Sequence, residues 1–143
     1  SRRLLNCGKL TDISALSGLK RLTSLDIHFC EIADISALSG LTSLKSLNLC
    51  GCKSQRSISA LSGLTNLESL FLSLCCNVTD LSPLSGLTDL SSLDLFGCQN
   101  ATNLSALPGL TNLKLLRLDG CSKIKMEDVD LLRRKLPNCR IAL

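Results

Sequence analysis

The sequence predicts a single repeat solenoid of the α/β class, and three observations support this. Five near-copies of one unit, each 22 or 23 residues long, fill most of the 143-residue chain. Within each unit the spacing of apolar residues changes from three to two. The last 17 residues leave this pattern and show helical spacing instead. Self-similarity at such a period is the signature of stacked structural units, so we expect an arc with a parallel concave β-sheet, a convex side of 3₁₀ turns or short helices, and a C-terminal helical cap.

The repeat boundaries follow from the alignment of the copies. Residues 1–12 align as a partial repeat if Leu5 matches Ile27 and Leu10 matches Ile32, which predicts a strand over residues 3–6. Because the chain starts inside a repeat and without methionine, we expect a fragment of a longer protein, with an upstream domain or a partner covering the N-terminal end. Residues 1–143 then form one domain with repeats at 13–34, 35–57, 58–80, 81–103 and 104–126 and a cap at 127–143.

The spacing inside one unit predicts its local structure. In residues 81–103, leucines three apart suit a tight turn of 3₁₀ type, whereas Leu93 and Leu95, two apart, suit a short strand. One unit cannot bury its own apolar row, but stacked units bury a continuous strip and pair their strands in parallel. A single repeat is therefore not expected to fold alone.

Two columns of turn-forming residues, one polar and one of glycine, mark the turns between strands. Small polar residues precede each convex turn and are expected to accept backbone N–H bonds there: Asp12, Asp34, Ser57, Asp80 and Asn103. A glycine column is expected to let the chain turn sharply, because glycine has no Cβ: Gly18, Gly40, Gly63, Gly86 and Gly109.

Five of the nine cysteines occupy one inward-facing column, where a thiol can serve as a small apolar group and a weak donor to the turn backbone. That role requires free thiols, which persist in reducing compartments, so we expect an intracellular protein of the cytoplasm or nucleus. Cys7, Cys50 and Cys76 lie off this column and are the expected exposed thiols. The column consists of Cys30, Cys52, Cys75, Cys98 and Cys121.

Two segments depart from the repeat. Gln55 stands where other units place Val78 or Ala101, and burial of an unpaired amide costs about 1 to 3 kcal/mol, so the loop over residues 53–57 is expected to bulge outward. Whether this loop is functional is left open. After residue 126, apolar residues at helical spacing up to Leu136, followed by Pro137, predict a terminal helix, with one last strand over residues 139–143.

The alternation of a strand predicts a binding face. If the paired leucines point inward, Phe71 and Phe96 must project from the concave sheet. An exposed apolar patch with acidic neighbours suits an apolar anchor that has a basic rim on the partner. The predicted protein-binding residues are Phe71, Phe96, Asp26, His28, Asn48, Ser73, Asp94, Arg117 and Asp119.

Composition and motifs argue against several other classes. No apolar run is long enough for a membrane span. Residues 57–113 contain no lysine or arginine, so nucleic acid is not favoured as a partner. His28 and Cys50 occupy the same strand position on adjacent repeats and could form a thiol–base pair or two metal ligands, but two ligands are too few for zinc. We favour surface residues without chemistry and predict no catalytic residue, metal or cofactor.

The pattern LxxLxLxxC, present at residues 22–30, 44–52, 67–75, 90–98 and 113–121, resembles the leucine-rich-repeat superfamily. The phrase at residues 32–44 is similar to the 22-residue class of bacterial internalins and of phosphatase-regulating repeat proteins. Cysteine at the last position resembles intracellular repeat proteins, including F-box proteins. Together these features most resemble repeat proteins of trypanosomatid parasites, some of which are described as adenylate cyclase regulators.

This resemblance implies a non-catalytic protein–protein interaction module that binds a partner on its concave face. The main alternative is a structural subunit buried in a larger multi-protein assembly. A regulatory subunit of a signalling enzyme and an RNA-associated protein are less favoured.

Overall fold

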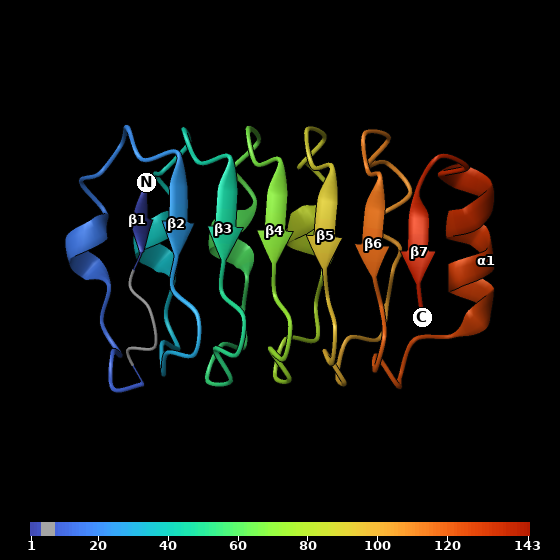
Figure 1. The fold of residues 1–143 in the computed structure, drawn as a ribbon, viewed down its shortest axis with the longest axis horizontal. Helices are drawn as coiled ribbons and strands as arrows, with labels where there is room; N and C mark the ends of the chain where they lie inside the picture. The colour runs from blue at the N-terminus through green and yellow to red at the C-terminus, as the bar shows by residue number, and fades with distance from the viewer. Residues whose placement is uncertain (4–7) are drawn as a thin grey trace.

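The solenoid is confirmed by the computed structural model, which describes residues 1–3 and 8–143. In this part of the chain, seven strands form one parallel sheet in sequence order, and the helix α1 lies beside its C-terminal end (Figure 1). The strands are β1 (Arg2–Arg3), β2 (Ser24–Asp26), β3 (Ser46–Asn48), β4 (Ser69–Phe71), β5 (Ser92–Asp94), β6 (Leu115–Arg117) and β7 (Arg140–Ala142).

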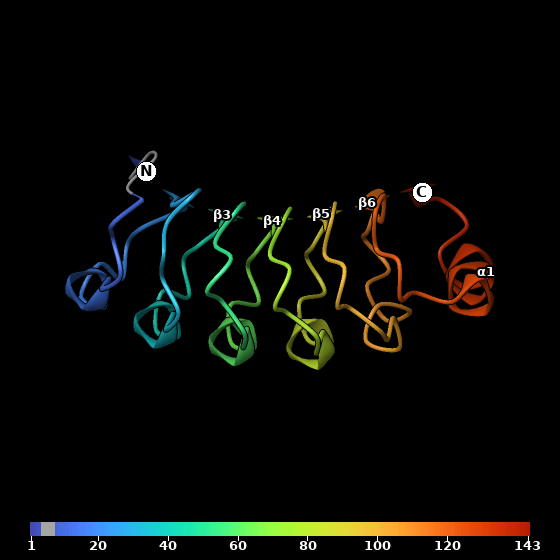
Figure 2. The ribbon, with the colours of Figure 1, turned by 90° about the horizontal axis from the view of Figure 1, so that it is seen from below.

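Short 3₁₀ helices line the side opposite the sheet, as Figure 2 shows. They are η1 (Ser14–Leu16), η2 (Ser36–Leu38), η3 (Ser59–Leu61) and η4 (Ser82–Leu84). In each of them, the serine after the helix donates its N–H to the first helical carbonyl, as Ser85 does to Ser82 at 3.1 Å. Pro108 replaces that serine in the fifth repeat and has no N–H to donate. The fifth turn is accordingly not a 3₁₀ helix.

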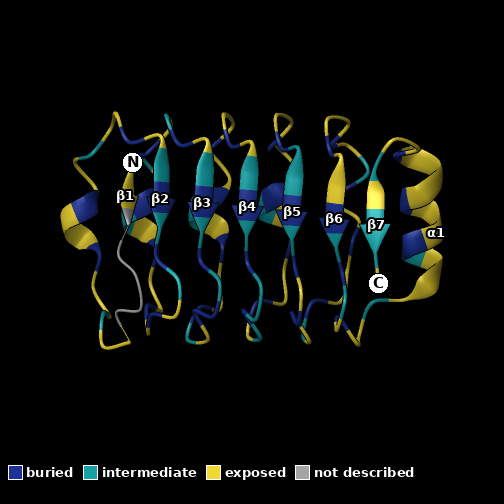
Figure 3. Ribbon diagram, in the orientation of Figure 1, coloured by how far each residue is buried: buried dark blue, intermediate teal, exposed yellow. Residues whose placement is uncertain are grey.

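The register aligns equivalent residues of successive repeats. Leu47 pairs with Leu25 on one side and with Leu70 on the other, and Leu93 and Leu116 continue the row. All five are at most 1% exposed, and the middle of each of these strands is buried (Figure 3). Burial of a leucine contributes about 1.5 to 3 kcal/mol, so this row holds the repeats together.

The cysteine column forms a ladder of thiol donors, which confirms the predicted role. Each thiol after the first donates to a carbonyl of the preceding repeat over 3.0 to 3.1 Å. Burial raises the pKa of Cys98 to about 12 and that of Cys75 further, which keeps both as thiols. These four ladder cysteines form no disulfide. The donors pair as Cys52 to Ile27, Cys75 to Leu49, Cys98 to Leu72 and Cys121 to Leu95.

The capping column is also confirmed. Asp12, Asp34, Asp80 and Asn103 each accept the backbone N–H of the serine two residues later at 2.7 to 2.8 Å, and Ser57 accepts from Ser59 at 3.3 Å.

The predicted reason for the glycine column is wrong. None of its five glycines, all of them described, has a positive φ. A Cβ on Gly18 or Gly109 would meet open space, and one on Gly63 or Gly86 would make an ordinary contact at 3.9 Å. A Cβ on Gly40 would meet only the mobile end of the Lys20 side chain, which can move away. The chain does turn at these positions, but the turn does not require glycine.

The expected outward bulge at Gln55 is wrong as well. This side chain is 1% exposed and fills the inward position that Val78 and Ala101 occupy in the next repeats. The amide nitrogen Nε2 donates a hydrogen bond to the carbonyl of Ser57, whereas the amide oxygen Oε1 accepts no hydrogen bond. The repeat keeps its shape around this residue, so packing outweighs the cost of one unsatisfied oxygen.

The C-terminal cap forms as predicted. Helix α1 (Met126–Lys135) begins with Glu127 and Asp128 in its first turn and buries Val129 and Leu132 against the last repeat. Strand β7 then pairs with β6. No helix in the described ranges is long and apolar enough to cross a membrane.

The N-terminal register differs from the prediction. Arg3 pairs with Asp26, which is one residue away from the alignment of Leu5 with Ile27. The rest of the strand predicted over residues 3–6 and the thiol of Cys7 lie outside the described residues.

Candidate protein-binding face

The nine predicted site residues lie in two neighbouring rows on the outer side of the sheet. The middle leucine of strands β2 to β5 is buried and its flanking residues are partly exposed. The parallel register therefore places the third residue of each strand beside the third residue of the next strand. The residues two positions after these also lie side by side and form a second row. The first row is Asp26, Asn48, Phe71, Asp94 and Arg117, and the second is His28, Cys50, Ser73, Phe96 and Asp119.

Phe96 is the centre of a fixed cluster on this face. Its side chain is 37% exposed, and the guanidinium carbon of Arg117 lies 5.0 Å from the ring centroid. Arg117 Nη1 contacts Asp94 Oδ2 at 3.1 Å, and its Nε lies 3.5 Å from Asp119 Oδ2. Asp94 Oδ1 also accepts the N–H of Phe96 at 2.9 Å. Two carboxylates thus hold the cation over the aromatic face, an arrangement worth about 0.5 to 1 kcal/mol at an exposed site.

The two predicted phenylalanines are not equivalent. Phe71 is only partly exposed and lies between Asn48 and Asp94 in its row, whereas Phe96 is exposed and lies between Ser73 and Asp119 in the other row. The predicted acidic rim is also partly occupied, because Asp94 and Asp119 contact Arg117 of the same chain. The face therefore has one exposed aromatic ring, Phe96, and one partly exposed ring, Phe71.

Among the described residues, no hydrogen bond joins His28 to Cys50. His28 Nδ1 lies 2.7 Å from Asp26 Oδ1, so its partner is the carboxylate of its own strand. Burial raises the pKa of the Cys50 thiol above its ordinary value, which opposes formation of a nucleophilic thiolate. In the described part of the chain, no three histidine, cysteine, aspartate or glutamate side chains are grouped to hold a metal ion.

Sequence reasoning missed a third exposed aromatic residue, Phe29. It follows His28, is 49% exposed, and meets the histidine ring edge-on at 5.5 Å. Its φ of 55° is left-handed, a conformation that costs a residue with a Cβ about 1 to 2 kcal/mol. Leu74, at the same repeat position, has a φ of 62°.

Glycines fill this left-handed position in the other three repeats. Their φ values are 72° at Gly51, 68° at Gly97 and 75° at Gly120. A Cβ on Gly51 would collide with the ring of Phe29, and one on Gly97 would lie 2.8 Å from Leu74 Cδ2. Each bulky residue thus leans over the glycine of the next repeat. The signal in the sequence was the residue before each ladder cysteine, which is glycine in three of five copies.

Asparagines outside this face have an architectural role. Asn66 and Asn112 donate to the carbonyls of Thr42 and Thr88 at 2.8 and 2.9 Å, and Asn77 and Asn100 reach back one repeat in the same way at 2.7 Å. These bonds fix the spacing of the repeats, so these side chains are not site candidates.

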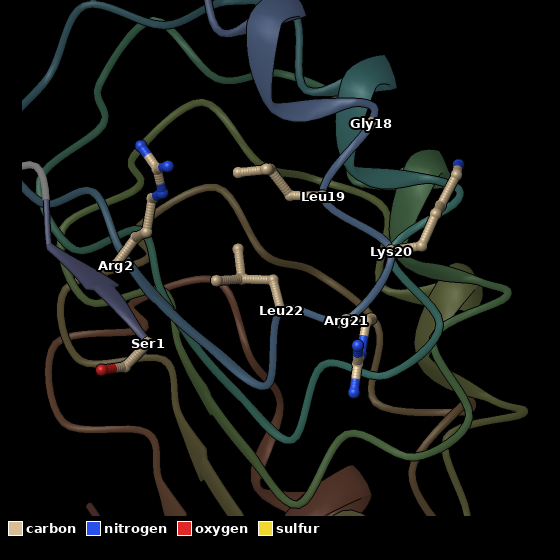
Figure 4. Close-up of a pocket in the computed structure, with 7 residues that line it drawn as sticks. All are labelled: Ser1, Arg2, Gly18, Leu19, Lys20, Arg21 and Leu22. Atoms are coloured by element: carbon tan, nitrogen blue, oxygen red, sulfur yellow. The ribbon is translucent and has the colours of Figure 1, made fainter.

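A separate pocket of about 510 Å³ lies at the N-terminal end of the solenoid. In Figure 4, Leu19 and Leu22 point toward Arg2, while Lys20 and Arg21 extend away from it. The pocket is lined by Ser1, Arg2, Gly18, Leu19, Lys20, Arg21 and Leu22.

Comparison with solved structures gives two relatives among the internalins of Listeria monocytogenes. The chain is 35% identical to internalin InlF, with a TM-score of 0.72 over 81% of this chain and 37% of that one. It is 30% identical to internalin C2, with a TM-score of 0.74 over 94% of this chain and 66% of that one. A leucine-rich-repeat protein of Leptospira interrogans shares the fold, with 21% identity and a TM-score of 0.60. That match covers 99% of this chain and 43% of the Leptospira chain.

The chain therefore spans between about one third and two thirds of the length of these relatives. No curated protein sequence matches it. The family described as "Leucine Rich repeats (2 copies)" matches twice, at residues 20–64 and 65–109. These two matches cover more than half of the sequence, and the chain belongs to the leucine-rich-repeat family.

Proposed function

We propose that the chain is a non-catalytic module that binds a protein partner on the face formed by the two outward rows of strands β2 to β6. Leucine-rich-repeat proteins are typically interaction proteins without catalysis. The observation that carries the proposal is the exposed ring of Phe96 in the middle of this face. Arg117 covers one side of the ring, and the backbone N–H of Phe96 donates to Asp94.

A fixed aromatic ring suits this role for an energetic reason. Binding restricts side-chain rotamers at a cost of about 0.5 to 1.5 kcal/mol for each flexible side chain. Because the cation and the carboxylates already hold Phe96, little of that cost remains when a partner covers it. Aromatic and arginine side chains are also the most frequent hot spots of protein interfaces.

The test is replacement of both rings by alanine. The wild-type chain is used to capture partners from its native cell, and the dissociation constant of each captured partner is then measured for wild type and for the Phe71→Ala, Phe96→Ala double variant. We expect the double variant to bind at least about tenfold more weakly, because hot-spot truncation costs about 2 kcal/mol or more. Its melting temperature should remain nearly unchanged, since neither ring belongs to the buried row.

A matched control removes two exposed apolar side chains from α1 through Met126→Ala and Leu131→Ala. This variant should bind like the wild type. The proposal fails if the control weakens binding as much as the double variant, or if the double variant unfolds, which would make the two rings part of the core.

We also propose an intracellular location, in the cytoplasm or nucleus. The support is the thiol ladder, in which four buried cysteines act as hydrogen-bond donors and so must remain reduced. Free thiols persist in reducing compartments. Fractionation of native cells tests this location. The protein is expected in the cytoplasmic or nuclear fraction, and its presence in an oxidising compartment would contradict the proposal.

A structural subunit is the second candidate, and the N-terminal pocket favours it. Leu19, which is half-buried, and Leu22, which is buried, line this pocket at one end of the stack, and another chain could cover it. Size-exclusion chromatography of the isolated chain separates the candidates. A monomeric, folded chain supports the interaction module, whereas aggregation that co-expression with a partner relieves supports the structural subunit.

A further inference from the structure

We infer that the partner places an aromatic side chain against Arg117, on the side of its guanidinium that faces away from Phe96. The occupant is a polypeptide segment with phenylalanine, tyrosine or tryptophan at its anchoring position. This inference rests on the proposed function and adds the chemistry of the partner to it. Its support comes from the direction in which Arg117 leans, the residues beside it and the groups that already contact its charge.

Arg117 leans toward the preceding strand, β5. Its guanidinium carbon lies 5.0 Å from the centroid of the Phe96 ring, and its Nη1 lies 3.1 Å from Asp94 Oδ2. Asp94 is the last residue of β5, and Phe96 follows it two residues later. Strand β7 lies on the other side of β6 (Figure 1). The side of Arg117 that faces β7 therefore takes part in neither contact.

The neighbour of Arg117 on the β7 side is small. Ala142 pairs with Arg117 in register, and paired residues of a parallel sheet project from the same face. Its methyl group leaves room where the other members of the first row have larger side chains. Leu115, two residues before Arg117, projects from the same face and is exposed. The guanidinium, a methyl group and an exposed leucine thus lie next to one another, and one planar ring can cover all three.

The guanidinium is the most accessible charged group of this cluster. The side chain of Arg117 is 41% exposed, whereas that of Asp94 is 14% exposed. Both oxygens of Asp94 are also occupied, because Oδ1 accepts the N–H of Phe96 at 2.9 Å and Oδ2 contacts Arg117. A partner that reaches this part of the face therefore meets the cation before it meets the carboxylate.

An aromatic ring suits this cation better than a carboxylate does. Asp94 and Asp119 already lie 3.1 and 3.5 Å from guanidinium nitrogens, so their charges repel a third carboxylate. A neutral ring is not repelled, and the negative charge of its π face attracts a cation. Guanidinium is also weakly hydrated and stacks on aromatic faces. The π face thus complements the charge of Arg117 without bringing another net charge to the site.

Peptide selection tests the inference with a defined probe. A random dodecapeptide library displayed on phage is selected on the wild-type chain, and sequences that also bind the Phe71→Ala, Phe96→Ala variant are discarded. The recovered peptides are expected to share an aromatic residue at one position. Ring-dependent peptides whose shared anchor is aliphatic or cationic overturn the aromatic partner and leave the proposed function standing. Recovery of no ring-dependent peptide overturns both.

A double-mutant cycle then locates the partner's ring. Arg117→Lys keeps the charge and removes the planar group, which makes this change disruptive at a stacked site. In parallel, the aromatic residue of a selected peptide is replaced by leucine. The leucine peptide should lose about three- to tenfold more affinity on the wild-type chain than on Arg117→Lys. Arg134→Lys, on the exposed face of α1, is the matched control and should show the wild-type loss. Equal losses on the wild type and on Arg117→Lys overturn the inference.

A filled variant gives a second measurement on the β7 side. Ala142→Phe places a ring of the chain itself beside Arg117, where the partner's ring is expected. A selected peptide should bind this variant at least about tenfold more weakly. The melting temperature should remain nearly unchanged, because the new side chain projects from the outer face of the sheet. Thr111→Phe, at an exposed position before β6, is the control and should bind like wild type. Unchanged binding of Ala142→Phe overturns the inference.

Discussion

The inward and outward rows of the same strands follow opposite rules. The inward row repeats one residue, leucine, at Leu25, Leu47, Leu70, Leu93 and Leu116. One position along, the outward row changes from aspartate to asparagine, phenylalanine, aspartate and arginine. Stacking demands equal shapes inside, because each side chain must fit the same space in the next repeat. The outward row does not have to meet this requirement, so its side chains can differ from repeat to repeat and give the surface its specific chemistry.

One buried residue breaks the inward rule. Gln55 fills an inward position of the 35–57 repeat with an amide, although its neighbours there are Val78 and Ala101. This exception and the rule itself can be tested by three changes, from the largest expected effect to the smallest.

Leu70→Ala should break the inward row. The side chain is fully buried between Leu47 and Leu93, and its removal leaves a cavity that neighbouring strands cannot fill. We expect a loss of about 2 to 5 kcal/mol in the free energy of unfolding, measured by urea denaturation. Ser69→Ala, one residue away and partly exposed, is the control and should change stability by less than about 1 kcal/mol. Similar losses in both variants would contradict the contrast between the rows.

Gln55→Val should restore the inward rule and stabilise the chain. The substitution removes Oε1, a buried acceptor without a hydrogen bond, and supplies the residue type of the next repeat. The expected gain is about 1 to 3 kcal/mol, the usual cost of an unsatisfied buried group. Lys53→Val, on the exposed part of the same loop, should give no gain. A loss of stability in Gln55→Val would show that the amide is better accommodated than its contacts indicate.

Cys98→Ala should weaken the ladder by about 1 to 2 kcal/mol, because Leu72 loses one donor and a small void forms. The effect should depend on pH. Burial raises the pKa of Cys98 from 9.0 to about 12, so the unfolded chain loses this proton first. The thiol's contribution is therefore complete below pH 9 and lost as the pH rises toward 12. Thermal melts between pH 8 and 11 should show a steeper decline for wild type than for Cys98→Ala, and parallel curves would contradict this.

The fold could be predicted because the sequence repeats the same unit five times. Any single copy is ambiguous, but leucines two apart in every copy point to one strand, and the same column of polar residues points to one capping position. The caps at Asp12, Asp34 and Asp80 and the terminal helix all formed as expected. Repetition averaged out the local ambiguity that limits the interpretation of one segment.

The errors occur where repeats differ or where a preference was given the wrong cause. Gln55 was expected outside because the cost of an unpaired amide was weighed without its bond to Ser57. Glycine was assigned a steric role at Gly18 and Gly109, where a Cβ has room. Phe29 was missed because a left-handed φ is a property of the backbone that residue types reveal only through the glycines at equivalent positions.

The alternation of bulky residues and glycines after the strands limits how this chain can change its length. Deletion of residues 35–57 would bring Phe29 against Leu74, whose Cβ would stand where Gly51 now leaves room. Deletion of residues 35–80 would bring Phe29 against Gly97, which fits. Loss of the unit that contains Gly51 is thus incompatible with Phe29, whereas loss of the unit that contains Leu74, alone or together with the Gly51 unit, leaves a glycine beside Phe29.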